Sequence, residues 1–156
     1  MTGVDMAAGR NTVDRREYEQ DLHRAVALQE AGKLAEAEAL YAKLLERNPE
    51  DPDALHLMGI VIHQRGDSAR GAALIGQAIN RLPDFPEAYN NLGNLLREWG
   101  KAAEAADAFS TAVELQPDYA LAFRNLSGVL KELGRPDEAL AAARAAARLQ
   151  PDSAAA

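Results

Sequence analysis

The prolines and glycines of this chain recur at a fixed spacing of 34 residues. Prolines stand at positions 49, 83, 117 and 151, and glycines at positions 32, 66, 100 and 134. The clearest copy of the repeated unit, residues 86–119, holds two runs with apolar residues three and four apart, 88–99 and 102–115, separated by Gly100. This pattern predicts two helices joined by a tight turn, and the unit fits the chain four times.

Small residues occupy a second set of positions in the same register. Mid-helix glycine costs roughly 1 kcal/mol relative to alanine, so Gly59, Gly71 and Gly93 indicate that two backbones approach closely there. Counting back 24, 12 and 5 residues from each proline reaches the expected contacts within each hairpin, and eleven of these twelve residues are Gly, Ala or Ser. The twelve are Ala25, Ala37, Leu44, Gly59, Gly71, Ala78, Gly93, Ala105, Ala112, Ser127, Ala139 and Ala146.

A helix–turn–helix period of 34 residues resembles the tetratricopeptide repeat, and the resemblance covers all but the ends of the chain. It implies an all-α fold, a right-handed α-solenoid of four stacked hairpins. An ordinary four-helix bundle gives no reason for such a fixed period. The expected repeats are 18–51, 52–85, 86–119 and 120–153.

The N-terminal residues 1–13 are small, polar and aperiodic, and we expect them to form a flexible tail before a repeat domain at 14–153. Asp51 and Asp67 are expected to cap helices, and Pro86 and Pro136 to open them. The predicted helices are 14–30, 34–47, 52–65, 68–81, 86–99, 102–115, 120–133 and 136–149.

The composition argues against several classes of function. The chain has no cysteine, which removes disulfides, thiol catalysis and thiolate metal sites. Its net charge is −7 without a basic run, so nucleic acid is not an expected partner. With no apolar run near roughly 18 residues and no signal-like N-terminus, we expect no membrane partner and a cytoplasmic location.

No catalytic motif stands out, so we expect no enzyme, no cofactor and no bound metal. The chain has no Gly-rich phosphate loop and no nucleophile elbow. His56 and His63 share a helical face, but two helical turns separate them by about 10 Å, too far for an easy shared metal site. We interpret them as hydrogen-bonding residues of a groove.

In a stack of such hairpins, the first helix of each lines the concave side. Asn91 and Asn125 lie one repeat apart and are expected to stack as rungs. An Asn amide offers donors and an acceptor, which match the groups that an extended peptide displays. The expected peptide-binding groove comprises His56, His63, Asn90, Asn91, Asn94, Arg97, Arg124, Asn125 and Lys131.

The run Asn-Asn-Leu-Gly-Asn-Leu-Leu at 90–96, with Arg-Asn-Leu at 124–126, is similar to the asparagine ladder in the repeats of O-GlcNAc transferases and SPINDLY-type proteins. That resemblance implies a ladder that holds a substrate peptide by its backbone. His23 and Leu57 stand at the matching places of the first two repeats, so the ladder here is expected to be short. The alternative is that these asparagines only bond neighbouring helices.

Some tetratricopeptide repeats form a carboxylate clamp for the C-terminal tails of chaperones, and this sequence argues against one. Leu22 and Val26 occupy places where the clamp needs Lys and Asn. Arg97, Arg124 and Lys131 still give the second half of the groove positive charge, which is expected to attract an acidic or phosphorylated segment.

The last hairpin ends without the polar capping helix that usually closes such arrays. Leu140, Ala143 and Ala147 fall on one face of its second helix and leave an apolar stripe open. Burying apolar surface contributes roughly 25 cal/mol per Å², so covering this helix face would contribute several kcal/mol to association. The entropy lost when two molecules associate and their side chains become ordered is comparable in size. Either more protein follows in the natural chain, or another molecule covers that end. In the second case we expect a weak homodimer through the C-terminal hairpin.

These patterns favour a non-enzymatic protein–protein interaction module, whose concave groove binds an extended or helical segment of another protein. One alternative is the N-terminal substrate-recognition region of a larger enzyme such as a glycosyltransferase. Another is a self-assembling scaffold that is joined through the open C-terminal end.

Overall fold

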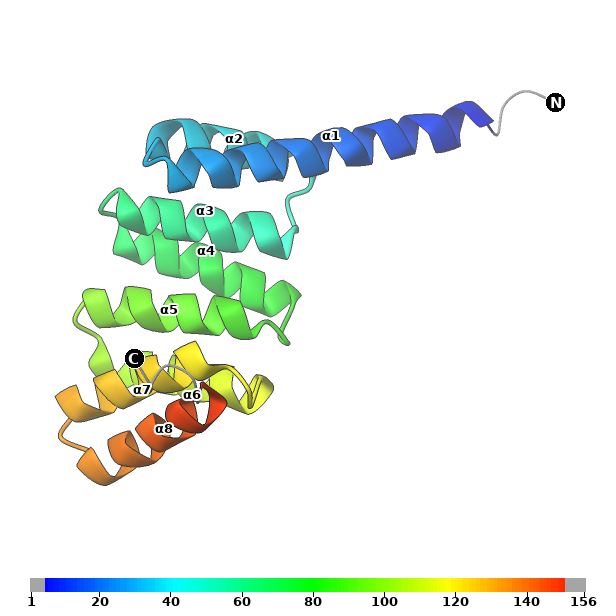
Figure 1. Cartoon of the computed structure of the whole chain (residues 1–156). Coiled ribbons are helices and arrows are strands. Elements are labelled where there is room, and N and C mark those ends of the chain that lie inside the picture. The colour runs from blue at the N-terminus through cyan, green and yellow to red at the C-terminus, as the bar shows by residue number, and fades with distance from the viewer. Residues whose placement is uncertain (1–4, 151–156) are drawn as a thin grey trace.

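The computed structural model describes residues 5–150, with side chains from Asp14 onward. Over this range the chain is all-helical and contains no strand. The helices form four antiparallel hairpins that follow one another as layers, from α1 and α2 at one end to α7 and α8 at the other (Figure 1). The helices are α1 Asp5–Glu30, α2 Leu34–Arg47, α3 Pro52–Gln64, α4 Ser68–Arg81, α5 Pro86–Glu98, α6 Ala102–Leu115, α7 Ala120–Glu132 and α8 Pro136–Leu149.

The helix boundaries agree with the sequence prediction except at the N-terminus. Helices α2 to α8 begin at the predicted residues and end within one residue of the predicted ends. Helix α1 instead begins at Asp5, not at 14. Residues 6–8 are Met-Ala-Ala, which favour helix, and an established helix extends at little cost. Most of the predicted tail is therefore helical here, while residues 1–4 and 151–153 lie outside the described residues.

The predicted turns and caps are present. Each turn glycine has a positive φ, between 70° and 102°, and the residue after it donates its N–H to a carbonyl five residues back, as Lys101 does to Leu96 at 2.8 Å. This is the Schellman arrangement, which needs the left-handed backbone that glycine adopts easily. The Asp51 carboxylate accepts from two N–H groups at the start of α3, and Asp67 accepts from the N–H of Arg70 in α4.

Within each hairpin the two helices meet at the predicted small residues, of which only Ala146 is not buried. A Cβ placed on Gly71 would lie 2.7 Å from the carbonyl oxygen of Gly59, so these backbones touch as predicted. At Gly93 the neighbour is instead the ring of Phe109, which a Cβ on that glycine would approach to 2.6 Å. In the last hairpin the hydroxyl of Ser127 donates to the carbonyl of Ala139 across the two helices, at 2.8 Å.

The hairpins stack with their first helices closest together. Each second helix contacts the next first helix, and α1, α3, α5 and α7 also contact one another in sequence. Over the described residues, the backbones of the second helices α2, α4, α6 and α8 do not approach one another in this way, although the Arg70 side chain of α4 lies 3.8 Å from the Glu38 carboxylate of α2. The first helices therefore line the inner, concave side, as the sequence predicts. The buried core is correspondingly a succession of local clusters rather than one central mass.

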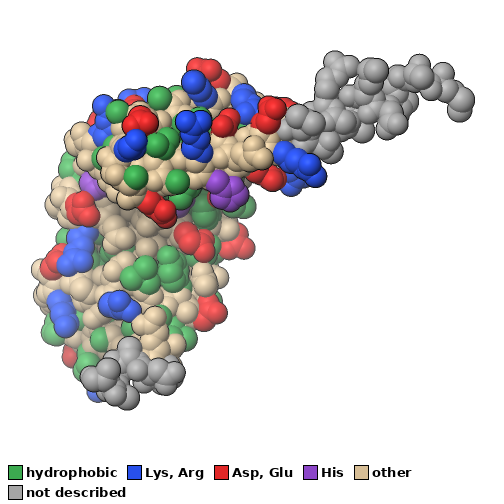
Figure 2. All heavy atoms as spheres, turned by 45° about the horizontal axis from the view of Figure 1, so that its top comes forward, with side chains coloured by type: hydrophobic (Ala, Val, Ile, Leu, Met, Phe, Trp, Pro, Cys, Tyr) green, Lys and Arg blue, Asp and Glu red, His purple; other side chains and the backbone are tan. Residues whose placement is uncertain are grey.

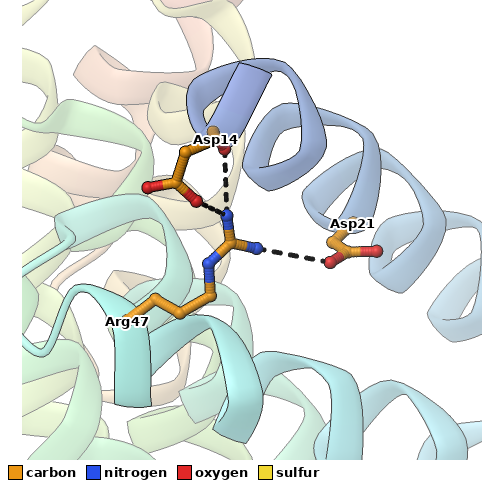
Figure 3. A network of polar contacts seen from close by, with 3 residues as sticks. All are labelled: Asp14, Asp21 and Arg47. Atoms are coloured by element: carbon orange, nitrogen blue, oxygen red, sulfur yellow. Dashed lines mark hydrogen bonds and ion pairs between the residues drawn. The ribbon is translucent and has the colours of Figure 1, made fainter. Parts of the chain in front are cut away.

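Near Asp14, helix α1 is bound to α2 by Arg47 (Figure 3), in addition to its packing against α2 and the hydrogen bond that the Tyr18 hydroxyl donates to Asp51. The Arg47 guanidinium donates to the carbonyl oxygen of Asp14 at 2.9 Å and to the carboxylate of the same residue. Its other terminal nitrogen lies 3.5 Å from the Asp21 carboxylate, and its central carbon lies 5.4 Å from the ring centre of Tyr18. In Figure 1, α1 extends well past the end of α2, so this contact stands near the last point where α1 is supported.

Candidate functional site: the concave groove

The predicted asparagines link successive first helices. The Asn91 amide nitrogen lies 2.9 Å from Nε2 of His56, and the Asn125 amide donates to Oδ1 of Asn90 at 2.9 Å. Asn91 and Asn125 were predicted to stack on each other, but each bonds the residue 35 positions earlier rather than 34. Each hairpin is rotated slightly against the one before it, and this rotation shifts the pairing by one residue.

Two of the predicted groove residues lie beneath the groove surface. His56 is 6% exposed and packs edge-on against the Phe85 ring, with the ring centres 4.9 Å apart, and Asn90 is 1% exposed. Burial lowers the pKa of His56 to about 4, so its ring is neutral at pH 7. An amide nitrogen can only donate, so Nε2 of His56 accepts from Asn91 and the ring proton sits on Nδ1. His56 and Asn90 therefore hold helices together.

The basic residues of the groove are partly neutralised. His63 bridges Ser68 through Nδ1, at 3.0 Å, and the carboxylate of Glu98 through Nε2, at 2.8 Å. Arg97 donates from Nε to Glu132 at 2.9 Å, and this hydrogen bond lowers the pKa of the Glu132 carboxyl. The sequence-based expectation of a basic half-groove is thus reduced, because Arg97 is already paired.

A hollow of about 180 Å³ opens between α3 and α5. It brings together three predicted site residues, His63, Asn91 and Asn94. Within the described part of the chain, Asn94 makes no hydrogen bond and the amide oxygen of Asn91 accepts none. The walls and floor of the hollow are Ile60, His63, Gln64, Ile75, Asn91, Asn94, Leu95 and Glu98.

Ile75 and Leu95 form part of this hollow although their apolar side chains indicate only core positions in the sequence. Arg124 and Lys131, which were predicted for the same groove, instead line a separate hollow between α7 and α8. The predicted site therefore divides into a polar hollow at the middle of the concave side and a basic one at the C-terminal end.

A pair of acidic residues on successive first helices was missed in the sequence. Asp53 and Glu87 stand one repeat apart near the starts of α3 and α5, and both are exposed. Although the residue is exposed overall, partial burial of its carboxyl group raises the pKa of Asp53, and the neighbouring carboxylates of Asp51 and Glu87 raise it further. The 34-residue spacing of Glu19, Asp53 and Glu87 was the available signal. Figure 2 shows basic and acidic side chains interspersed over one face, so this pair is a local feature.

Among the described residues, no group of three or more His, Asp or Glu side chains is close enough to hold a metal ion. None of the described helices has the length and apolar character needed to span a bilayer.

Sequence comparisons place the chain in a family. Models of the tetratricopeptide repeat match residues 28–96, 86–119 and 124–153, which together span most of the chain. With the stacked hairpins already described, this defines the class: an α-solenoid of the kind that serves as a protein-interaction module. The chain belongs to the tetratricopeptide repeat family. No comparison links its repeats to those of O-GlcNAc transferases or SPINDLY-type proteins in particular.

Solved structures agree on the fold. A crystal structure of MamA matches with a TM-score of 0.79 at 17% identity, covering 92% of this chain and 84% of that chain. The structure of pilF from Pseudomonas aeruginosa matches with a TM-score of 0.82 at 20% identity, covering 88% of this chain and 63% of that chain. At these identities the likeness concerns the fold alone. No curated protein matches the sequence.

Proposed function

We propose that this chain is a non-catalytic protein-interaction module that holds an extended or helical segment of a partner protein in its concave groove. The observation that carries the proposal is the hollow between α3 and α5, where the amide group of Asn94 and the amide oxygen of Asn91 have no hydrogen-bond partner among the described residues. An amide presents both donors and an acceptor, so it suits the alternating N–H and C=O groups of a peptide backbone.

The charge of the groove supports a partner segment that carries basic residues. Asp53 and Glu87 are exposed on successive first helices and have no ion-pair partner among the described side chains. The basic residues His63 and Arg97 are engaged with acidic partners of the chain itself. A segment with Lys or Arg along one side would thus meet complementary charge, which chiefly favours association rate and selectivity.

Asn94 provides the sharpest test, because it lines the hollow and makes no hydrogen bond of its own among the described residues. After a partner is retrieved with the purified chain and reduced to a minimal peptide, Asn94→Ala is expected to weaken binding about fivefold, the effect of one hydrogen bond of about 1 kcal/mol. The melting temperature should stay unchanged. Gln77→Ala, on an exposed position of α4, is the matched control.

Asn125→Ala distinguishes a structural role from a binding role. Its loss leaves Oδ1 of the buried Asn90 without its donor, so we expect a lower melting temperature. Equal peptide affinity of the wild type and Asn94→Ala would contradict the proposal that the partner segment binds in this groove.

A further inference from the structure

Three times in this chain, one face of a hairpin is covered by the first helix of the next hairpin. Helix α3 covers α1 and α2, α5 covers α3 and α4, and α7 covers α5 and α6. The covering helices share a pattern in which an alanine and a branched aliphatic residue stand seven positions apart and are at most 1% exposed. These pairs are Ala54 with Val61, Ala88 with Leu95, and Ala122 with Val129.

The fourth face of this kind, on α7 and α8, is open within the described part of the chain. A hollow of about 540 Å³ lies there, lined by Arg124 and Lys131 from α7 and by Ala143, Ala146 and Ala147 from α8. Two of the three residues of the predicted apolar stripe, Ala143 and Ala147, thus line it. The third, Leu140, does not line the hollow and is 49% exposed.

The charges of this face follow the register of the inner helices. His63 and Arg97 each pair with a glutamate 35 residues later, on the next first helix. Lys131 occupies the same position in the fourth repeat and has no acidic partner among the described side chains. Arg124 donates to the amide oxygen of Gln150 at 2.8 Å, which leaves its charge uncompensated. The cations of Arg124 and Lys131 therefore border the alanine-lined hollow between α7 and α8.

We propose that this open face binds an amphipathic helix of a partner protein, and that the helix supplies a carboxylate to Lys131. The internal copies give the pattern that fits: a small residue, a branched aliphatic residue seven positions later, and an acidic residue three positions after that. Ala88, Leu95 and Glu98 of α5 show this pattern on the face of α3 and α4. This surface is distinct from the hollow between α3 and α5.

A second copy of the chain fits this face less well. Helix α1 has Gln20, Arg24 and Ala27 at the positions that correspond to Ala54, Met58 and Val61 of α3, and all three are exposed. The outer face of α1 therefore lacks the apolar residues that would pack against the hollow between α7 and α8. The two-fold homodimer expected from the sequence would place the Arg124 and Lys131 cations of both copies in one interface. Repulsion between these like charges opposes that arrangement.

The test uses a fluorescently labelled synthetic peptide with the sequence of residues 84–101, which contains the α5 pattern. Its binding to the whole chain is measured by anisotropy. We expect saturable binding that Lys131→Glu weakens about fivefold, as for a favourable partly buried ion pair. A peptide that carries Lys in place of Glu98 should bind the wild type weakly and the Lys131→Glu protein more tightly. Lys43→Glu, an exposed position of α2, is the charge-matched control and should change nothing.

Ala147→Arg places a bulky side chain in the hollow at an exposed position, so it should abolish binding without affecting the circular dichroism spectrum. Binding that survives Ala147→Arg, or that is indifferent to Lys131→Glu, overturns the proposal. So does the absence of saturable binding. A dimer of the chain that Ala147→Arg disrupts, without peptide binding, assigns the face to a second copy instead.

Discussion

At the scale of single residues, two glycines of α4 are expected to respond in opposite ways to one substitution. A Cβ on Gly71 would lie 2.7 Å from the backbone oxygen of Gly59 and 3.0 Å from Cβ of His63, whereas a Cβ on Gly76 meets nothing within 4 Å. We expect Gly71→Ala to destabilise the chain by about 1–3 kcal/mol through overpacking. Gly76→Ala should stabilise it by about 0.5–1 kcal/mol through helix propensity.

Urea unfolding of the two variants measures this difference directly. Because both glycines belong to one helix, a general tolerance or intolerance of α4 would shift both midpoints in the same direction. Such a result would mean that the contact with Gly59 does not restrict the size of the side chain at position 71.

The buried His56 gives folding stability a pH dependence. Its folded pKa is about 4, below its ordinary value of 6.5, so the unfolded chain takes up the proton first as pH falls. The neutral His56 contributes about 3 kcal/mol to the free energy of unfolding above pH 6.5, and this contribution is lost as the pH falls from about 6.5 to 4. His56→Gln retains an acceptor for Asn91 and cannot titrate.

Between pH 7 and pH 4.5, the urea midpoint of the wild type should therefore fall further than the urea midpoint of His56→Gln. The carboxylates of the chain titrate equally in both proteins, so their effect cancels in the comparison. Identical losses would show that His56 is not the group responsible.

At the scale of an element, Arg47 is expected to control how far α1 stays ordered. Arg47→Met keeps the apolar stem but removes the contacts to Asp14 and Asp21. Amide hydrogen exchange over residues 14–21 should become about fivefold faster, which corresponds to about 1 kcal/mol of local opening. Exchange in α8 should not change.

Arg81→Met is the control for this substitution. Arg81 pairs with Glu50 at 2.8 Å, but both side chains are more than half exposed, so little stability is expected from that pair. Unchanged exchange of α1 in Arg47→Met would indicate that packing against α2 suffices to hold it.

The elements themselves were largely predictable, because each boundary has its own local signal. Gly100 and Pro117 act on the backbone beside them, and helix α6 between them falls where they indicate. The start of α1 was not predictable in this way, since a helix extends into residues 5–13 without an apolar pattern to mark it.

The site was less predictable, because it depends on how hairpins are rotated against each other. A period of 34 in the sequence suggests that Asn125 faces Asn91, while the rotation brings it to Asn90. The same shift pairs Arg97 with Glu132 and removes a charge that the sequence assigned to the groove. A sequence repeat gives the composition of each layer but not the angle between layers.

At the scale of the whole molecule, the first helices touch one another along the concave side while the backbones of the second helices, over the described residues, stay farther apart. Opening or closing the angle between two hairpins therefore disturbs few contacts between second helices on the outside, such as the ion pair of Arg70 with Glu38, and the line through the first helices serves as the pivot. Small changes of angle at each junction between hairpins add up, so the curvature of the whole solenoid should change at low energetic cost. The solenoid can tighten around a slender segment or widen for a thicker one, with the hydrogen bonds at the pivots kept intact.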